Sequence, residues 1–136
     1  MKSWQVNALA ILIGGAVGSL LRYGVNTWSV FTAFPLGTLL ENISASFILG
    51  GLTGWILYVT LPEWFRLGAG VGFCGSFSTM SMLAADATVL IQHGTFYGPI
   101  LYLFLSLFGG VGSGLLGLLI GEKMGKRERK IHQHGR

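Results

Sequence analysis

The sequence predicts an all-α membrane protein built from four transmembrane helices. Three observations support this fold class. Hydrophobic residues make up 51% of the 136 residues and charged residues only 10%, whereas a soluble domain carries roughly a quarter charged residues. The mean hydropathy is +0.64. Four apolar runs, at residues 6–28, 37–60, 64–92 and 97–120, each reach the ~20 residues that a spanning helix needs.

The first run, residues 6–28, is predicted to be a membrane span. It is too long for a removed signal peptide and lacks a small-residue cleavage site. Gly14 and Gly18 are four residues apart, which lets another helix approach closely. Arg22 follows at the same spacing, and two interpretations of it stay open. Its guanidinium either extends to the lipid headgroups or lies in an aqueous vestibule where it concentrates anions.

Pro35 lies just before the second run, residues 37–60, and suits the first turn of a helix. Asn42 follows early in the span. An amide inside a membrane is costly unless it is paired, so Asn42 either joins two helices or lines a pathway. Glu41 is interpreted as facing the headgroup region, with no particular role.

The third run contains an unusual stretch, GVGFCGSFSTMSMLAAD at residues 70–86, rich in glycine, serine and threonine. Glycines weaken the helix here, so the third span is predicted to be broken. Non-helical backbone at this depth persists only where protein buries it or where it lines a cavity. The alternative is an unbroken, tightly packed interface of small residues. Cys74, as the single cysteine, is interpreted as a packing residue.

The fourth run places Ser106, Gly110 and Gly114 on one stripe of a helix, which favours close contact with another helix. Catalytic patterns such as a Ser-His-Asp set, HExxH, CxxC or a phosphate-binding loop are not found at meaningful spacing. The sequence therefore does not predict an enzyme.

The distribution of basic residues predicts the orientation. An even number of spans puts both termini and the loop between spans two and three on one side. That side carries eight of the nine basic residues: Lys2, Arg66, Lys123, Lys126, Arg127, Arg129, Lys130 and Arg136. The positive-inside rule then places both termini in the cytoplasm. We divide the chain into a transmembrane domain, 1–122, and a basic cytoplasmic tail, 123–136, which contacts lipid headgroups. The tail lacks interleaved aromatic residues, so no nucleic-acid partner is expected.

Three segments carry a resemblance to a known family: GGAVGSLLRYG, FPLGTLLENISASFILG and GFCGSFSTMS. Together with the four-span layout, they resemble the CrcB/Fluc family of bacterial fluoride channels. The resemblance implies an antiparallel dimer in the bacterial cytoplasmic membrane, with two narrow pores that export cytoplasmic fluoride passively and lower its concentration in the cell. It also implies a structural sodium ion held by backbone carbonyl groups, at the positions that match Gly75 and Ser78.

Fluoride is small and strongly hydrated, so a pore must replace its water with hydrogen-bond donors. Asn42 offers an amide, Arg22 offers positive charge at the mouth, and hydroxyl groups donate as well. The predicted fluoride pathway comprises Arg22, Asn42, Thr79, Met80, Ser81, Leu83, Tyr102 and Ser106.

The chain departs from the family pattern after the break. Met80 and Leu83 occupy positions where the family has phenylalanines, whose ring edges face the anion. Asp86 occupies a position where the family commonly has Glu. A pore lined by this segment is therefore expected to be impaired or altered. Antiparallel pairing also requires two orientations, whereas the basic tail permits one. Both facts are explained if the chain pairs with a different, oppositely oriented family member.

Two alternatives remain. The chain is a non-conducting structural partner subunit of a fluoride channel, which the lost phenylalanines favour. The less favoured alternative is a small multidrug-type exporter, which relies on a membrane-embedded acid in its first span. Residues 6–28 contain no Asp or Glu.

Overall fold

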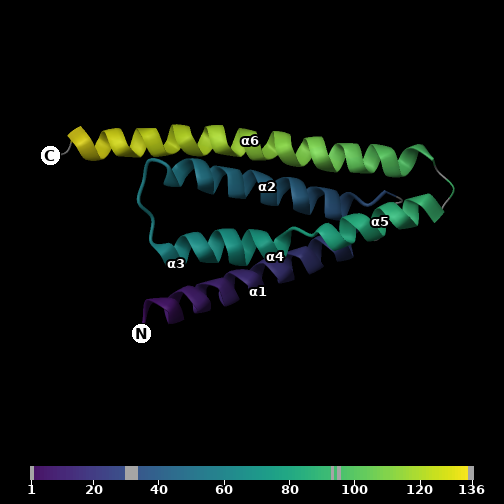
Figure 1. Ribbon diagram of the computed structural model, residues 1–136, viewed down its shortest axis with the longest axis horizontal. Helices are drawn as coiled ribbons and strands as arrows, with labels where there is room; N and C mark the ends of the chain where they lie inside the picture. Colours follow the sequence, from purple (N-terminus) through teal and green to yellow (C-terminus); the bar gives the residue numbers. More distant parts are fainter. Residues whose placement is uncertain (1, 30–33, 93, 95, 135–136) are drawn as a thin grey trace.

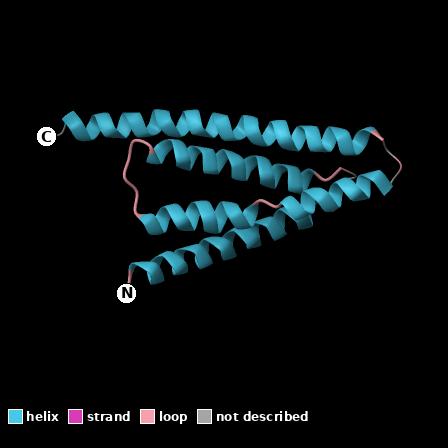
Figure 2. Cartoon of the chain, in the orientation of Figure 1, coloured by secondary structure: helices cyan, strands magenta, loops and turns pink. Residues whose placement is uncertain are grey.

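The computed structural model describes residues 2–29, 34–92, 94 and 96–134, and every regular element within them is a helix (Figure 2). In chain order these are α1 (Ser3–Ser29), α2 (Leu36–Ile56), α3 (Glu63–Arg66), the π-helix η1 (Leu67–Cys74), α4 (Gly75–Phe77), α5 (Met80–Gln92) and α6 (Tyr97–His134).

Four segments of the described chain are long and apolar enough to cross a membrane: Ser3–Ser29, Leu36–Ile56, Glu63–Gln92 and Tyr97–Ile131. The third combines α3, η1, α4 and α5. The beginning of α1, the α2–α3 connection and the end of α6 all lie at one end of the molecule (Figure 1). The predicted all-α, four-span fold is confirmed, and the chain is a multi-pass membrane protein.

Helix α1 packs closely against η1 through glycines. A Cβ added at Gly14 would overlap the carbonyl of Gly68, and one added at Gly18 would lie 2.5 Å from the carbonyl oxygen of Phe73. Both are closer than real Cβ contacts, so only glycine permits this approach of two main chains. The close approach predicted for Gly14 and Gly18 is confirmed.

Helices α2 and α6 run side by side along most of α2 (Figure 1). Added Cβ atoms at Gly117 and Gly121 of α6 would overlap the carbonyls of Phe47 and Gly51 on α2. The predicted stripe takes part as well, because a Cβ added at Gly50 of α2 would overlap the carbonyl of Gly114, so the close helix contact expected there is confirmed at Gly114. Helix α6 then continues past the end of α2 as one uninterrupted helix to His134, so the residues assigned to the tail extend the fourth span without a change of structure.

The third span is broken, as predicted, but not within the glycines. Residues 67–74 keep helical hydrogen bonding in the wider turns of a π-helix. The chain leaves the helix at Ser78, whose φ of −77° and ψ of 155° are extended. The glycine run instead provides the close contact with α1, as the alternative interpretation proposed for small residues. The break is therefore located at Ser78, a few residues after the last glycine of the run, Gly75.

The buried core lies where α2, α5 and α6 meet, near the end of the molecule opposite the termini. Its members are Leu39, Ala87, Leu90 and Tyr102, with Phe34 in an edge-to-face contact with the Tyr102 ring at 5.6 Å between centroids. Many large apolar side chains elsewhere point outward, which is the arrangement expected of helices that face lipid or another subunit.

Candidate functional site

The break in the third span is held by Asn42 of α2. The amide of Thr79 donates to Asn42 Oδ1 at 2.8 Å, and Asn42 Nδ2 donates to the carbonyl of Thr79 at 3.1 Å. The side-chain amide thus bonds both main-chain groups of one residue, as a neighbouring β-strand would. Of the two interpretations of Asn42, joining helices is what this geometry shows. One of its two N–H hydrogens is still available to a further acceptor.

This pairing releases two carbonyl groups from the helical pattern. In an unbroken helix the Thr79 amide would donate to Gly75, but here it donates to Asn42. The Met82 amide would donate to Ser78, but it donates to the Thr79 hydroxyl at 3.3 Å, which acts as an N-cap for α5. Gly75 is exposed and Ser78 is half-buried. Free carbonyl oxygens are suitable ligands for a hard cation, so these two residues fit the predicted sodium ion.

An open groove of about 860 Å³ runs between α2, the break and α6. Five of the eight predicted pathway residues line it, namely Asn42, Thr79, Met80, Leu83 and Ser106. Leucines from α2 and α6 form much of the remaining wall. The structure therefore brings polar donors from three different segments together along a largely apolar passage, with the Met80 side chain 80% exposed at its edge.

The other three predicted residues are not among those that line the groove. The Ser81 hydroxyl lies 3.2 Å from the Thr79 hydroxyl, so the two form a hydrogen-bonded pair next to the break. Tyr102 is fully buried, and its hydroxyl donates to Asp86 Oδ2 at 3.0 Å. The side chain of Thr38 belongs to the same hydrogen-bonded network. Arg22 is half-buried on α1, where its charge acts on Glu41.

The interpretation of Glu41 as a headgroup-facing residue is wrong. Its side chain is 0% exposed, and neither carboxyl oxygen has a hydrogen-bond partner among the residues described. Thr38 and Glu41 are three residues apart on α2, so they share a face, and Tyr102 of α6 interacts with both of them. The sequence showed the spacing of Thr38 and Glu41, but not which helix would cover them.

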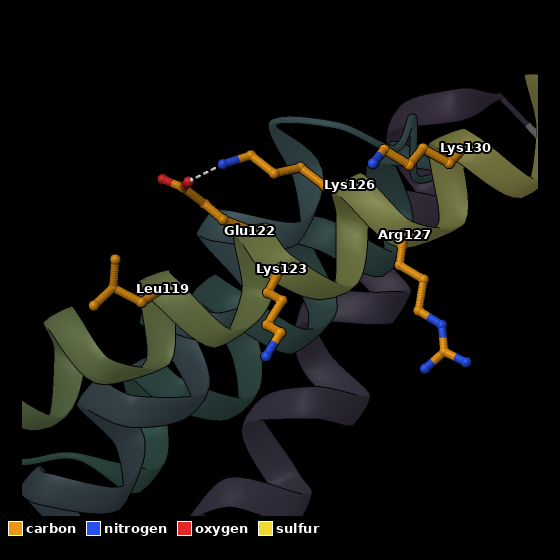
Figure 3. A pocket seen from close by; sticks show the side chains of 6 residues that line it. All are labelled: Leu119, Glu122, Lys123, Lys126, Arg127 and Lys130. Atoms are coloured by element: carbon orange, nitrogen blue, oxygen red, sulfur yellow. Dashed lines mark hydrogen bonds and ion pairs between the residues drawn. The ribbon is translucent and has the colours of Figure 1, made fainter.

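A second hollow, of about 440 Å³, lies along the last part of α6, beginning beside the end of α2 (Figure 3). Its lining is mainly cationic: Leu119, Glu122, Lys123, Lys126, Arg127 and Lys130. The Lys126 ammonium pairs with Glu122 at 2.9 Å and lies 5.0 Å from the centre of the Tyr58 ring. Trp55 at the end of α2 donates to Glu128 at 2.8 Å, which ties the α6 extension to α2.

This geometry can be compared with known proteins. Residues 9–118 match the family described as CrcB-like protein, Camphor Resistance (CrcB). The chain belongs to the CrcB family. Within it, the chain is 48% identical over 130 residues to the fluoride-specific ion channel FluC 2 of Halalkalibacterium halodurans, covering 96% of both chains. It is 40% identical to FluC of Gloeobacter violaceus, over 82% of this chain and 93% of the relative.

A third CrcB relative, FluC 2 of Bacillus licheniformis, is 42% identical over 91% of this chain and 90% of the relative. The resemblance drawn from the three sequence segments is therefore confirmed at the level of the family. All three relatives are named as fluoride-specific ion channels. The three matches cover 82–96% of this chain.

Proposed function

We propose that the chain is one subunit of a passive, fluoride-selective channel in the bacterial cytoplasmic membrane. The observation that carries the proposal is the break of the third span, held open by Asn42 beside a groove with donors from α2, the break and α6. The CrcB relatives are named as fluoride-specific ion channels, which supports fluoride as the conducted ion. Export of cytoplasmic fluoride then follows its concentration gradient and requires no covalent chemistry.

Different residues replace the water around fluoride, some by positive charge and others by hydrogen-bond donation. Arg22 supplies positive charge near the end of α1 and raises the local concentration of anions. Asn42 offers its remaining amide hydrogen, and the hydroxyl groups of Thr79 and Ser106 donate along the groove. The leucine-lined wall keeps the passage apolar, which strengthens each of these hydrogen bonds.

The released carbonyls of Gly75 and Ser78 support a structural sodium ion shared between two subunits. Two carbonyls from one chain are too few to surround a cation, and Gly75 is exposed. An antiparallel partner would bring a second, matching pair to the same point. The bound sodium would supply the positive charge that holds these four carbonyl dipoles together.

The partner in this proposal is a different CrcB-family chain, inserted in the opposite orientation. The cationic end of α6 supports a single orientation for this chain, with both termini in the cytoplasm. Met80 and Leu83 line the groove without aromatic rings. A partner that contributes phenylalanines to a shared pore would complete the passage that Asn42 and Ser106 begin.

The test is fluoride efflux from liposomes, measured with a fluoride electrode. The chain is purified through a tag from cells that naturally make it, so that its partner accompanies it, and it is also purified alone from a host without CrcB proteins. The proposal predicts fluoride efflux without chloride efflux from the pair. Robust efflux from the chain alone would overturn the heteromeric arrangement, and absence of efflux from both preparations would overturn the channel.

The exposed Met80 side chain favours a second candidate, a non-conducting structural subunit. The two functions are separated by Asn42→Ala in the purified pair. Efflux falls if this chain contributes to a pore. It stays unchanged, with the pair still assembled, if the partner alone conducts.

A further inference from the structure

Glu41 is the most unusual buried group in the molecule. A side chain that carries a carboxyl group is completely enclosed, with both oxygens lacking a hydrogen-bond donor among the residues described. An ionised carboxylate in this setting has lost its hydration without gaining partners, which is strongly unfavourable. The neutral acid form avoids most of this cost, because only a dipole and not a charge is enclosed.

The surroundings of Glu41 include few groups that compensate a negative charge. Arg22 on α1 is the positive charge that acts on Glu41. It is only half-buried, so its effect on Glu41 is weaker than that of an enclosed charge. Asp86 on α5 is a second carboxylate, and its charge opposes ionisation of Glu41. Tyr102 on α6 is a third titratable group that interacts electrostatically with Glu41. Helix α4 has no titratable side chain, and η1 contributes Cys74 alone.

This enclosed group lies beside the predicted pathway. Tyr102 and Ser106 are one turn apart on α6, and Ser106 lines the groove. The Ser106 hydroxyl is itself buried without a partner among the described residues. Glu41 precedes Asn42 on α2 and interacts with Tyr102. Two buried polar groups without partners among the described residues therefore belong to the helices that form the groove: Ser106 lines it, and Glu41 directly precedes the groove residue Asn42.

We propose that Glu41 is a proton-binding residue of the fluoride pathway, and that its carboxyl group must be in the neutral acid form for the anion to pass Tyr102. In that form it offers a hydroxyl donor to the anion. As a carboxylate it offers only acceptors and a repelling charge. The inference rests on the proposed channel function and adds to it that fluoride flux depends on the occupancy of one proton site.

The experiment compares fluoride efflux by the tagged pair with that by its Glu41→Gln variant, from roughly pH 5 to pH 9. Efflux from protein-free vesicles is subtracted at each pH. Wild-type flux should decrease as pH rises, by at most about tenfold per pH unit, the limit for one proton. Glu41→Gln, which is always neutral, should remove this decrease. The exposed Glu63→Gln should retain it.

Equal pH profiles for wild type and Glu41→Gln would overturn the inference while leaving the channel function intact. A second measurement requires no flux. Infrared spectra of the pair should contain the carbonyl band of a protonated carboxylic acid at neutral pH, absent in Glu41→Gln and also in Glu41→Leu. Spectra without that difference band would overturn the inference. If the band is present and no preparation conducts, the role of Glu41 in a pathway fails together with the channel proposal.

Discussion

Replacing Asn42 by alanine removes the side chain that holds the third span open. Two main-chain groups of Thr79, bonded at 2.8 and 3.1 Å, lose their partner. Thr79 is 8% exposed, and a buried main-chain group without a partner costs about 1–3 kcal/mol. For the N–H and C=O groups of Thr79 together, the loss of stability would be roughly 2–6 kcal/mol. Water from the adjoining groove reduces the cost, so we expect a loss of about 2–3 kcal/mol.

The assay is equilibrium unfolding in mixed detergent micelles, followed by helical circular dichroism. The matched control is Asn7→Ala, the same truncation on α1 away from the break, which should cost about 0.5 kcal/mol or less. Fluoride efflux by the assembled pair should fall as well, because the donors at the break lose their positions. If Asn42→Ala is no less stable than Asn7→Ala, the hydrogen bonds to Thr79 do not hold the break.

Three further outcomes are expected. Gly117→Ala should destabilise the α2–α6 pair by about 2 kcal/mol or more in the same unfolding assay, because its Cβ would overlap the main chain of α2; Gly112→Ala, with nothing within 4 Å, should cost little, and equal effects would contradict this packing. Trp55→Phe should cost about 1 kcal/mol and make the end of α6 more sensitive to protease, and an unchanged cleavage rate would show that the bond to Glu128 does not hold the extension. Tyr102→Phe should lower fluoride efflux by the pair without preventing its purification, and unchanged efflux would exclude its hydroxyl from the pathway.

The sequence was sufficient to predict the four spans, since their length and apolarity set the fold class directly. It also predicted that the third span breaks, because glycine and hydroxyl residues gather there. It did not locate the break, since that depends on Asn42, which is 37 residues away from Thr79 and competes for its amide. A contact between two helices of this kind has no local sequence pattern.

The same limit applies to the site. The groove residues were found through their resemblance to a family, and their side chains do converge. Glu41 was misjudged because its position near the start of a span is typical of a headgroup-facing residue. Burial of Glu41 depends on how the other helices pack around α2, and the glycines that permit the close approach of α6 lie further along that helix. The sequence shows that residue 41 is a glutamate, but it does not show that the side chain is buried.

In the proposed channel, this chain contributes its own break and groove to the fluoride pathway. The most direct measurement is fluoride efflux from liposomes containing the tagged pair, with and without Asn42→Ala in this chain alone. We predict rapid, chloride-excluding fluoride efflux for the unmodified pair and a loss of at least about tenfold for the variant, equivalent to 1.4 kcal/mol. Equal fluoride efflux from the two preparations, at equal assembly, would contradict the claim.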